Sequence, residues 1–388
     1  MKKVLIYYRH FITLGGAEFL PLTFIAEAQK TCAVTLALDS TLNFETATRT
    51  FKIPLDMSRL KIVQIMPENY RSTDSGFFLS FYRSRRLKRL AKDAEICISL
   101  SNVIDFGKPA HHFLTSIDLG DEAFHNFVKH LNQPQHVPLK KRVCRFLIDE
   151  CVRPLLRMRS KRSIISRAKE NIYPNSFFME KLVKRFYGSC RSTVFYPPTI
   201  FEFNHQNVLR NPLHVVYLGR IVPEKRVFDI IEIVERARAA SGKDILLSIA
   251  GHWWSEGFKE ETMRFASDKK WIMFPGEIFG EQKAELLLSG TYAIHAMREE
   301  AFGISITEYL KAGLIPIVPD EGGACEVVDN RDLSFRTNEE AANILVKLLN
   351  DPEFRELQRR RCAERAKVFS RDAYLERQRK ILRDIVGD

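Results

Sequence analysis

Two carboxylates flank the start of a predicted helix in the C-terminal half of the chain. Glu300 ends a strand and loop segment, Gly303 opens the helix, and Glu308 lies within it. A carboxylate can accept hydrogen bonds from the vicinal hydroxyls of a ribose or a hexose. The backbone N–H groups of Phe302, Gly303 and Ile304, at the helix start, can meet phosphate. Glutamates that only cap the helix are the alternative explanation.

Two cations follow an earlier strand of the same half. Gly219 comes directly after the apolar run 214–218, and Arg220 and Lys225 lie on the loop that leads into the next helix. Arginine can chelate two phosphate oxygens and lysine adds a point charge. Both side chains would stabilise the negative charge that builds on a leaving diphosphate. Surface cations beside a tight turn are the alternative.

Glycine pairs mark two further turns. Gly15 and Gly16 follow the first apolar run, and Gly322 and Gly323 follow a later one that ends at Pro319. Glycine lets the backbone approach a phosphate closely, although packing alone also explains such a turn.

Buried strands and helices alternate in both halves and would position these residues. We expect strands at 4–8, 33–38, 60–65 and 96–100, with a helix at 77–92, and then strands at 214–218, 245–250, 271–274, 292–296 and 315–318. This alternation predicts two α/β, doubly wound lobes. Ligands of such sheets bind beyond the carboxyl ends of the strands, where the glycines, cations and carboxylates lie.

The length of 388 residues favours two domains. We place the N-terminal domain at 1–205 and the C-terminal domain at 206–370, with a polar linker from 204 to 212. A final helix, 371–388, carries a narrow apolar stripe, and we expect it to cross back to the N-terminal domain.

The net charge of +12 is unevenly distributed. Residues 1–200 hold 32 basic and 17 acidic side chains, whereas 201–388 hold 28 and 31, so the halves carry +15 and −3. The excess predicts that the N-terminal half meets an anionic partner. The segment 140–169 holds eleven basic residues among apolar ones and could lie on an anionic membrane surface, or it could be a solvated helical face.

The seven cysteines are scattered without a C-x-x-C pair, which favours a reducing compartment and no zinc site. No apolar run reaches the eighteen or so residues that a membrane-spanning helix needs. We therefore expect a cytoplasmic protein, with peripheral attachment at the membrane face as an option.

Together these features resemble the family-4 retaining glycosyltransferases of GT-B architecture, over nearly the whole chain. The E-x7-E motif of that family matches Glu300 to Glu308, and its G-R-x-x-x-x-K element matches Gly219, Arg220 and Lys225. Further matches are the Gly-Gly-Ala-Glu of 15–18, the Gly-Gly-x-x-Glu of 322–326, and the junction segments at 174–176, 187–188 and 196–198.

The resemblance implies two Rossmann-like lobes that face a central cleft. It implies that Arg220 and Lys225 hold the diphosphate of a UDP- or GDP-sugar, Glu308 the ribose, and Glu300 the sugar hydroxyls, with Gly16 reaching the phosphate from the opposite lobe. It also implies same-face substitution through an oxocarbenium-like state, in which the departing phosphate oxygen helps to deprotonate the acceptor. Glu300 would then position groups and stabilise charge, and no metal or other cofactor would be needed.

The acceptor side departs from the family pattern. Many relatives carry a histidine near the end of an N-terminal strand, and here that place corresponds to His112 or is taken by Thr115 or Ser116. We treat His112 as a candidate contact of the sugar, although a lone histidine is often a packing residue.

The expected function is transfer of a sugar from a nucleotide-diphosphate sugar to a glycan or lipid-linked acceptor, as in polysaccharide or glycolipid biosynthesis. Hydrolysis or epimerisation of the nucleotide sugar on the same fold is the first alternative. A nucleic-acid-binding protein is the second, but the sequence has no recognised nucleic-acid motif and no aromatic residues interleaved with the basic run.

Overall fold

The computed structural model describes most of the chain. The described residues are 1–11, 16–68, 70–71, 76–116, 124, 127–128, 143, 147–166, 169–206 and 208–387. They divide into two compact units, one of Met1–Pro197 with Tyr374–Asp388, and one of Pro198–Ala373. The observed boundary at Pro197 lies eight residues before the predicted one, because the 198–206 stretch belongs to the second unit.

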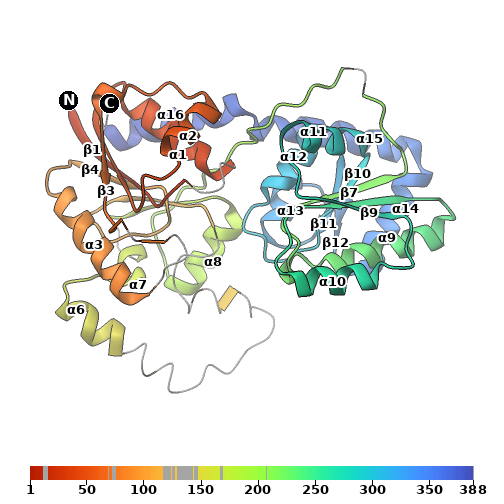
Figure 1. Cartoon of the computed structure of the whole chain (residues 1–388), viewed down its shortest axis with the longest axis horizontal. Coiled ribbons are helices and arrows are strands. Elements are labelled where there is room, and N and C mark those ends of the chain that lie inside the picture. Colours follow the sequence, from red (N-terminus) through yellow and green to blue (C-terminus); the bar gives the residue numbers. More distant parts are fainter. Residues whose placement is uncertain are drawn as a thin grey trace. The chain divides into compact units, whose positions relative to one another are not determined.

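The first unit is a parallel six-stranded sheet with helices on both faces. Its strands follow the order β3-β2-β1-β4-β5-β6. They are β1 (Lys2–Tyr8), β2 (Cys32–Leu38), β3 (Leu60–Gln64), β4 (Ile96–Ser99), β5 (His111–Leu114) and β6 (Asn171–Pro174). Its helices are α1 (Gly16–Ala28), α2 (Phe44–Phe51), α3 (Phe77–Ala91), α6 (Arg153–Leu155), α7 (Lys161–Ile165), α8 (Phe177–Tyr187) and α16 (Arg371–Val386). In Figure 1, α1, α2 and α16 lie on one side of the sheet and α3 lies on the other.

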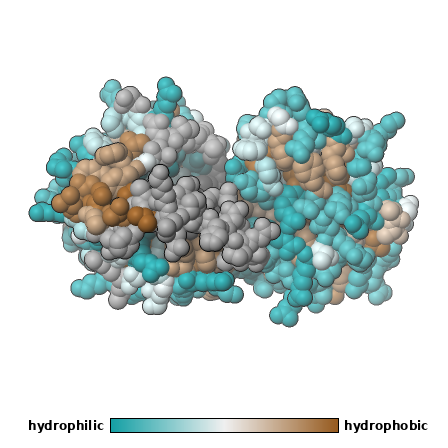
Figure 2. Space-filling view, turned by 90° about the horizontal axis from the view of Figure 1, so that it is seen from below, coloured by the Kyte–Doolittle hydropathy of each residue, from teal (hydrophilic) through white to brown (hydrophobic). Residues whose placement is uncertain are grey.

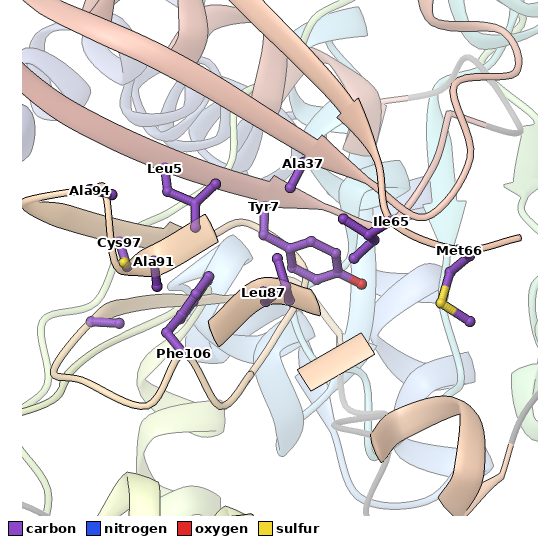
Figure 3. Packing of buried hydrophobic residues seen from close by; sticks show 11 residues of the cluster. Leu5, Tyr7, Ala37, Ile65, Met66, Leu87, Ala91, Ala94, Cys97 and Phe106 are labelled. Atoms are coloured by element: carbon purple, nitrogen blue, oxygen red, sulfur yellow. The ribbon is translucent and has the colours of Figure 1, made fainter. Parts of the chain in front are cut away.

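The core beside β1 and β4 shows why the strands of this sheet have continuous runs of apolar residues. Leu5 and Tyr7 of β1 pack against Leu87 and Ala91 of α3, with Phe106 completing the cluster (Figure 3). All five side chains are at most 1% exposed. Strands covered on both faces need apolar residues at every position, as β1 has from Val4 onward.

The last helix, α16, belongs to the first unit from Tyr374 onward. Tyr374 and Gln378 of α16 lie against Thr23 of α1, whose Oγ1 is 3.2 Å from the Tyr374 hydroxyl and accepts a 3.0 Å hydrogen bond from the Gln378 amide. All three polar side chains are buried. These bonds fix the register of α16 because an unpaired polar group would be costly there.

The second unit repeats the architecture of the first. Its sheet order is β12-β11-β10-β7-β8-β9, again wholly parallel. The strands are β7 (His214–Leu218), β8 (Leu246–Ala250), β9 (Ile272–Gly276), β10 (Tyr292–Ile294), β11 (Ile315–Pro319) and β12 (Ser334–Phe335). The helices are α9 (Val227–Ser241), α10 (Glu256–Phe265), α11 (Gly280–Ser289), α12 (Ile304–Ala312), α13 (Gly322–Val328), α14 (Asn338–Asn350) and α15 (Pro352–Ala366). Figure 1 shows α9, α10 and α14 on one side of this sheet and α11, α12 and α15 on the other.

Candidate functional site

The strand order creates one place in the second unit where a ligand is expected. β7 is bonded to β8 on one side and to β10 on the other, so the connections leave the sheet in opposite directions at these two strands. In open α/β sheets the crevice beyond the carboxyl ends at such a switch point holds the ligand. Gly219 follows β7 and His295 follows β10. The loop that carries Arg220 and Lys225, here called the cation loop, therefore lies beside the loop that carries Glu300, here called the carboxylate loop.

The cation loop is held down by the loop after β8. The backbone N–H of Ile221 donates to His252 O at 2.8 Å, and that of Trp254 donates to Ile221 O at 3.0 Å. The approach is so close that a Cβ added to Gly251 would lie 1.8 Å from the Gly219 carbonyl oxygen. The loop that carries Arg220 therefore has a fixed backbone.

Replacing Gly251 with alanine should disrupt this support. Gly251 has a φ of +150°, and the added Cβ would overlap Gly219 O, so the cation loop must shift or the β7 and β8 ends must separate. We expect a loss of about 2–4 kcal/mol in the free energy of unfolding, measured by denaturant titration. Gly257→Ala is the matched control, because nothing lies within 4 Å of its added Cβ in α10. A Gly251→Ala protein as stable as the control would contradict the close approach.

Lys225 and Glu300 form a buried ion pair. A 3-10 turn, Pro223–Lys225, brings the lysine back over the end of β7, where Nζ contacts Glu300 Oε2. Both side chains are only 15% exposed. Burial alone would raise the pKa of Glu300, but the lysine charge and the nearby His295 outweigh it, and the net pKa lies well below the usual range. The carboxylate is therefore ionised at neutral pH.

The carboxylate loop rests on the second glycine pair. Gly323 donates its backbone N–H to Glu300 O at 2.7 Å. A Cβ at Gly322 would lie 2.2 Å from Arg298 O, and one at Gly323 would lie 2.4 Å from Ala301 O. Gly322 and Gly323 thus allow close packing beneath Glu300.

Helix α12 begins as predicted. Gly303 caps it with a φ of +96°, and its carbonyl accepts from Thr307 N at 3.3 Å. Phe302 is buried against Phe369, with ring centroids 5.6 Å apart, whereas Ile304 is 37% exposed. The first backbone N–H groups of α12 therefore start beside the Glu300 loop, where an anion would benefit from the helix dipole.

Glu308 has a partner that the sequence did not reveal. Lys283 of α11 places Nζ 2.7 Å from Glu308 Oε1 and 4.7 Å from the centroid of the Phe201 ring. The next residue, Tyr309, joins α12 to β7, because its buried hydroxyl accepts from Leu218 N at 2.7 Å and donates to Leu218 O at 3.0 Å. These bonds fix the distance from the helix that carries Glu308 to the strand that carries the cation loop.

Arg220 differs from the other three charged residues of the site. Its side chain is exposed, and within the described ranges its guanidinium forms no ion pair. Its carbonyl accepts a 2.9 Å hydrogen bond from the buried Tyr217 hydroxyl, so the backbone is anchored while the side chain remains available. The structure thus joins Lys225 directly to Glu300 and carries Arg220 on the same short loop as Lys225.

In the first unit, His112 has the environment of a packing residue. It is the second residue of β5 and fully buried, and its Nε2 lies 3.2 Å from Glu170 Oε2. Glu170 in turn accepts from Arg159, which also binds Asp105 at 2.8 Å. Burial lowers the pKa of His112 despite the glutamate. This geometry favours the packing alternative, and contact with a sugar stays a prediction.

The structure describes the other N-terminal candidate residues only in part. Thr115 and Ser116 lie just past the carboxyl end of β5, and Asn102 links them by accepting from Thr115 N at 3.1 Å and donating to Ser116 Oγ at 3.2 Å. Gly16 is the first residue of α1, and Gly15 lies outside the described residues. A role for either glycine at a phosphate stays a prediction.

Comparison with known proteins identifies the second unit. Residues 200–369 match the family model described as glycosyl transferases group 1. This stretch is a glycosyltransferase group 1 domain. It contains Arg220, Lys225, Glu300 and Glu308, and the match supports the predicted enzyme class, a glycosyltransferase.

A curated relative agrees with this class. The chain is 26% identical over 220 residues to YqgM of Bacillus subtilis (strain 168), described as an uncharacterized glycosyltransferase. The alignment spans 55% of this chain and 59% of that relative.

Solved structures confirm the predicted GT-B fold class. HepE (Alr3699) of Anabaena, solved with UDP and glucose, has 16% identity, a TM-score of 0.65 and full coverage of both chains. WaaG, a glycosyltransferase of lipopolysaccharide biosynthesis, has 14% identity and a TM-score of 0.66, covering 97% of this chain and 99% of its own. Sucrose-phosphate synthase of Thermosynechococcus elongatus has 13% identity, a TM-score of 0.67 and full coverage of both chains.

Two further features are absent from the described residues. No group of three or more His, Cys, Asp or Glu side chains in this part of the chain could hold a metal ion. No helix in it has the length and apolar character needed to cross a membrane.

Proposed function

We propose that this chain is a retaining glycosyltransferase that moves a sugar from a nucleotide-diphosphate sugar to a glycan or lipid-linked acceptor without a metal ion. The observation that carries the proposal is the meeting of Lys225 and Glu300 at the β7 and β10 ends, with Arg220 on the same loop and Glu308 on the helix beyond. Cations for a diphosphate and carboxylates for hydroxyls are the two chemistries that such a donor needs.

The donor diphosphate would take the place beside the cation loop. Arg220 would chelate two phosphate oxygens, and Lys225 would share its charge between Glu300 and the phosphate. As the glycosidic bond breaks, negative charge develops on the departing diphosphate, and fixed cations stabilise it more than they stabilise the ground state. The start of α12 adds dipole stabilisation at the same place.

Glu300 would bind the sugar rather than attack it. Its Oε2 contacts Lys225 Nζ and lies 3.3 Å from His295 Nε2, and among the described residues nothing donates to Oε1. One oxygen is thus left for a sugar hydroxyl, while the ionised group also stabilises an oxocarbenium-like centre. In this scheme the departing phosphate oxygen accepts the acceptor proton, and the new bond forms on the face that the phosphate leaves.

The solved relatives motivate the choice of nucleotide. Structures of HepE are described with UDP-glucose and with UDP, which makes a UDP-sugar the first donor to test and a GDP-sugar the second.

A thermal-shift screen with UDP, GDP, ADP and CDP tests the donor site. A ligand that binds only the folded state at one hundred times its Kd adds about 2.7 kcal/mol, so one nucleotide should raise the melting temperature by several degrees. Product analysis with the matching nucleotide sugar and no acceptor should show slow hydrolysis at most. Rapid turnover without an acceptor would favour the hydrolase or epimerase alternative, and no shift with any nucleotide would refute the donor site.

We also propose that the first unit docks on an anionic membrane. Phe78 of α3 is 82% exposed, and Leu155, at the end of α6, is 83% exposed. The Arg153 guanidinium lies 5.5 Å from the Phe77 ring centroid, which joins the two helices. Figure 2 shows a hydrophobic patch on one face of this unit. Exposed apolar side chains beside a surplus of basic ones are typical of interfacial binding.

Vesicle sedimentation measures this docking. We expect the protein to sediment with vesicles of phosphatidylcholine and phosphatidylglycerol, to bind pure phosphatidylcholine at least tenfold less, and to be released by salt. Leu155→Glu should weaken binding, whereas Phe279→Glu, which changes an exposed aromatic residue of the second unit, should not. Equal binding to both vesicle types would remove the electrostatic part of the proposal.

A further inference from the structure

His295 has no assigned role, yet it lies at the centre of the site. It follows β10 directly, and its backbone N–H donates to Ile317 O at 3.0 Å, which continues the bonding between β10 and β11. The side chain is 1% exposed. Its Nε2 is 3.3 Å from Glu300 Oε2, the same oxygen that Lys225 contacts.

The geometry defines what the ring can do. Within the part of the chain that the structure describes, neither ring nitrogen makes a hydrogen bond, and Nε2 is the nitrogen that lies close to Glu300 Oε2, at 3.3 Å. A neutral ring that carries its proton on Nε2 can therefore point that N–H at the carboxylate and leave Nδ1 as the unprotonated nitrogen. Burial is the largest influence on the pKa of His295 and lowers it, and Lys225 adds to this effect, while Glu300 opposes both.

The surrounding groups support a neutral donor. The charges that act on His295 are those of Glu300 and Lys225. Tyr217 of β7 and Tyr309 of α12 lie within electrostatic range of Glu300, and burial raises the pKa of each, so both stay protonated. Their hydroxyls donate to Arg220 O and Leu218 O, so among the described residues Lys225 and His295 are the groups placed to hold the Glu300 carboxylate.

Donor binding would change the balance between these two partners. A diphosphate attracts the Lys225 ammonium strongly, and a flexible lysine stem can follow it. His295 cannot move in this way, because it is buried and its backbone is fixed in the sheet. Without a second partner, Glu300 would lose its orientation when the lysine turns to the phosphate.

We propose that His295 is the positioning residue of Glu300: its Nε2–H holds Oε2 while Lys225 engages the donor diphosphate, so that Oε1 stays directed at a sugar hydroxyl. This inference rests on the proposed function, because it assigns His295 a part in the sugar half of the same site.

Two substitutions of His295 separate positioning from packing. His295→Gln keeps an N–H donor and His295→Phe removes it while filling the space. We expect His295→Phe to lower kcat at least twentyfold and to bind UDP within threefold of wild type, since UDP has no sugar for Glu300 to hold. His295→Gln should keep kcat within about fivefold of the wild-type value. It should also remove from the pH profile of kcat any change that arises from titration of His295. If the thermal-shift screen favours GDP, GDP and GDP-glucose replace UDP and UDP-glucose.

His214 provides the matched control. It is also a buried histidine of this sheet, but it begins β7 at the opposite edge and its Nε2 lies 2.8 Å from Ser248 Oγ. His214→Phe should lower the melting temperature without changing the pH profile or the ratio of UDP-glucose to UDP affinity. If His295→Phe lowers kcat no more than His214→Phe does, the proposal is overturned.

A measurement without ligand separates this inference from the proposed function. In the ¹⁵N spectrum of the histidine rings, His295 should show the Nε2–H tautomer, and Glu300→Gln should shift its signals. A ring protonated on Nδ1 alone would overturn the positioning role even in an active enzyme. If the ring shows the expected tautomer but the protein binds none of the four nucleotides, the proposed function is refuted. The role of His295 at a sugar is then refuted with it.

Discussion

Replacing Arg220 with alanine should lower the rate of sugar transfer by about 10²–10³-fold, the usual effect of removing one preorganised group that stabilises transition-state charge. The side chain is exposed and its backbone is held by Tyr217, so the fold should not depend on it. A surface change of this kind alters the free energy of unfolding by about 0.5 kcal/mol or less, and the melting temperature by about 2 °C at most.

Steady-state kinetics with a UDP-sugar and differential scanning calorimetry measure the two effects of Arg220→Ala separately. Arg236→Ala is the matched control, because Arg236 is exposed on α9 and pairs with Glu232 one turn away, at 2.7 Å. That variant should keep full activity. Arg220→Ala with wild-type kcat and KM would remove the diphosphate role from the cation loop.

Replacing Lys225 with methionine should damage both stability and activity. The substitution leaves Glu300 ionised and largely buried, with His295 as its remaining ion-pair neighbour among the described residues. Breaking one partner of a buried ion pair typically costs about 3–5 kcal/mol of unfolding free energy. Glu300→Gln combined with Lys225→Met should restore most of that stability, because no buried charge remains, while transfer stays at least 10²-fold below wild type.

The pH dependence of the Lys225→Met defect has a defined sign. In the wild-type protein the pKa of Glu300 is lowered from the ordinary 4.5, so the pairing stabilises the fold above that pH and loses its effect as the pH falls through the lowered value. Without the lysine, burial raises the pKa, and protonation then relieves the cost. The stability deficit measured by denaturant titration should thus be largest near pH 7 and shrink toward pH 4. A deficit that is constant over this range, or a double variant less stable than Lys225→Met, would contradict the buried pair.

The sequence predicted the fold well because the determining signals are local. β7 was predicted at its observed bounds, His214–Leu218, since five consecutive apolar or buried positions end at a glycine. β1 began two residues before the predicted start, because Lys2 and Lys3 are exposed but still pair with β2. β5 received no strand prediction of its own, since His111-His112-Phe-Leu is too short and too polar to stand out.

The pairings within the site could not be predicted in the same way. Lys225 and Glu300 are 75 residues apart, and Lys283 and Glu308 are 25 residues apart, so no spacing rule connects them. Gly251 carried no motif, although its missing Cβ is what allows the cation loop to close on β8. His295 could have been noticed as a polar residue inside the apolar run predicted as a strand at 292–296. Its role depends on a carboxylate whose orientation only the folded loop defines.

The basic segment that motivated a membrane partner is described only in part. Within it the structure covers 143, 147–166 and 169, and the Lys140 end lies outside the described residues. Arg159, which the sequence placed among surface cations, instead forms ion pairs with Asp105 and Glu170, both buried. The anionic partner is therefore better sought at α3 and Leu155 than along the whole basic run.

The crystal structure of the protein with a UDP-sugar or its UDP product tests the central claim most directly. The account predicts diphosphate oxygens within hydrogen-bonding distance of both Arg220 and Lys225, ribose hydroxyls on Glu308, and, with the intact sugar, a hydroxyl on Glu300 Oε1. A nucleotide bound elsewhere in the chain, or one whose phosphates touch neither cation, would contradict it.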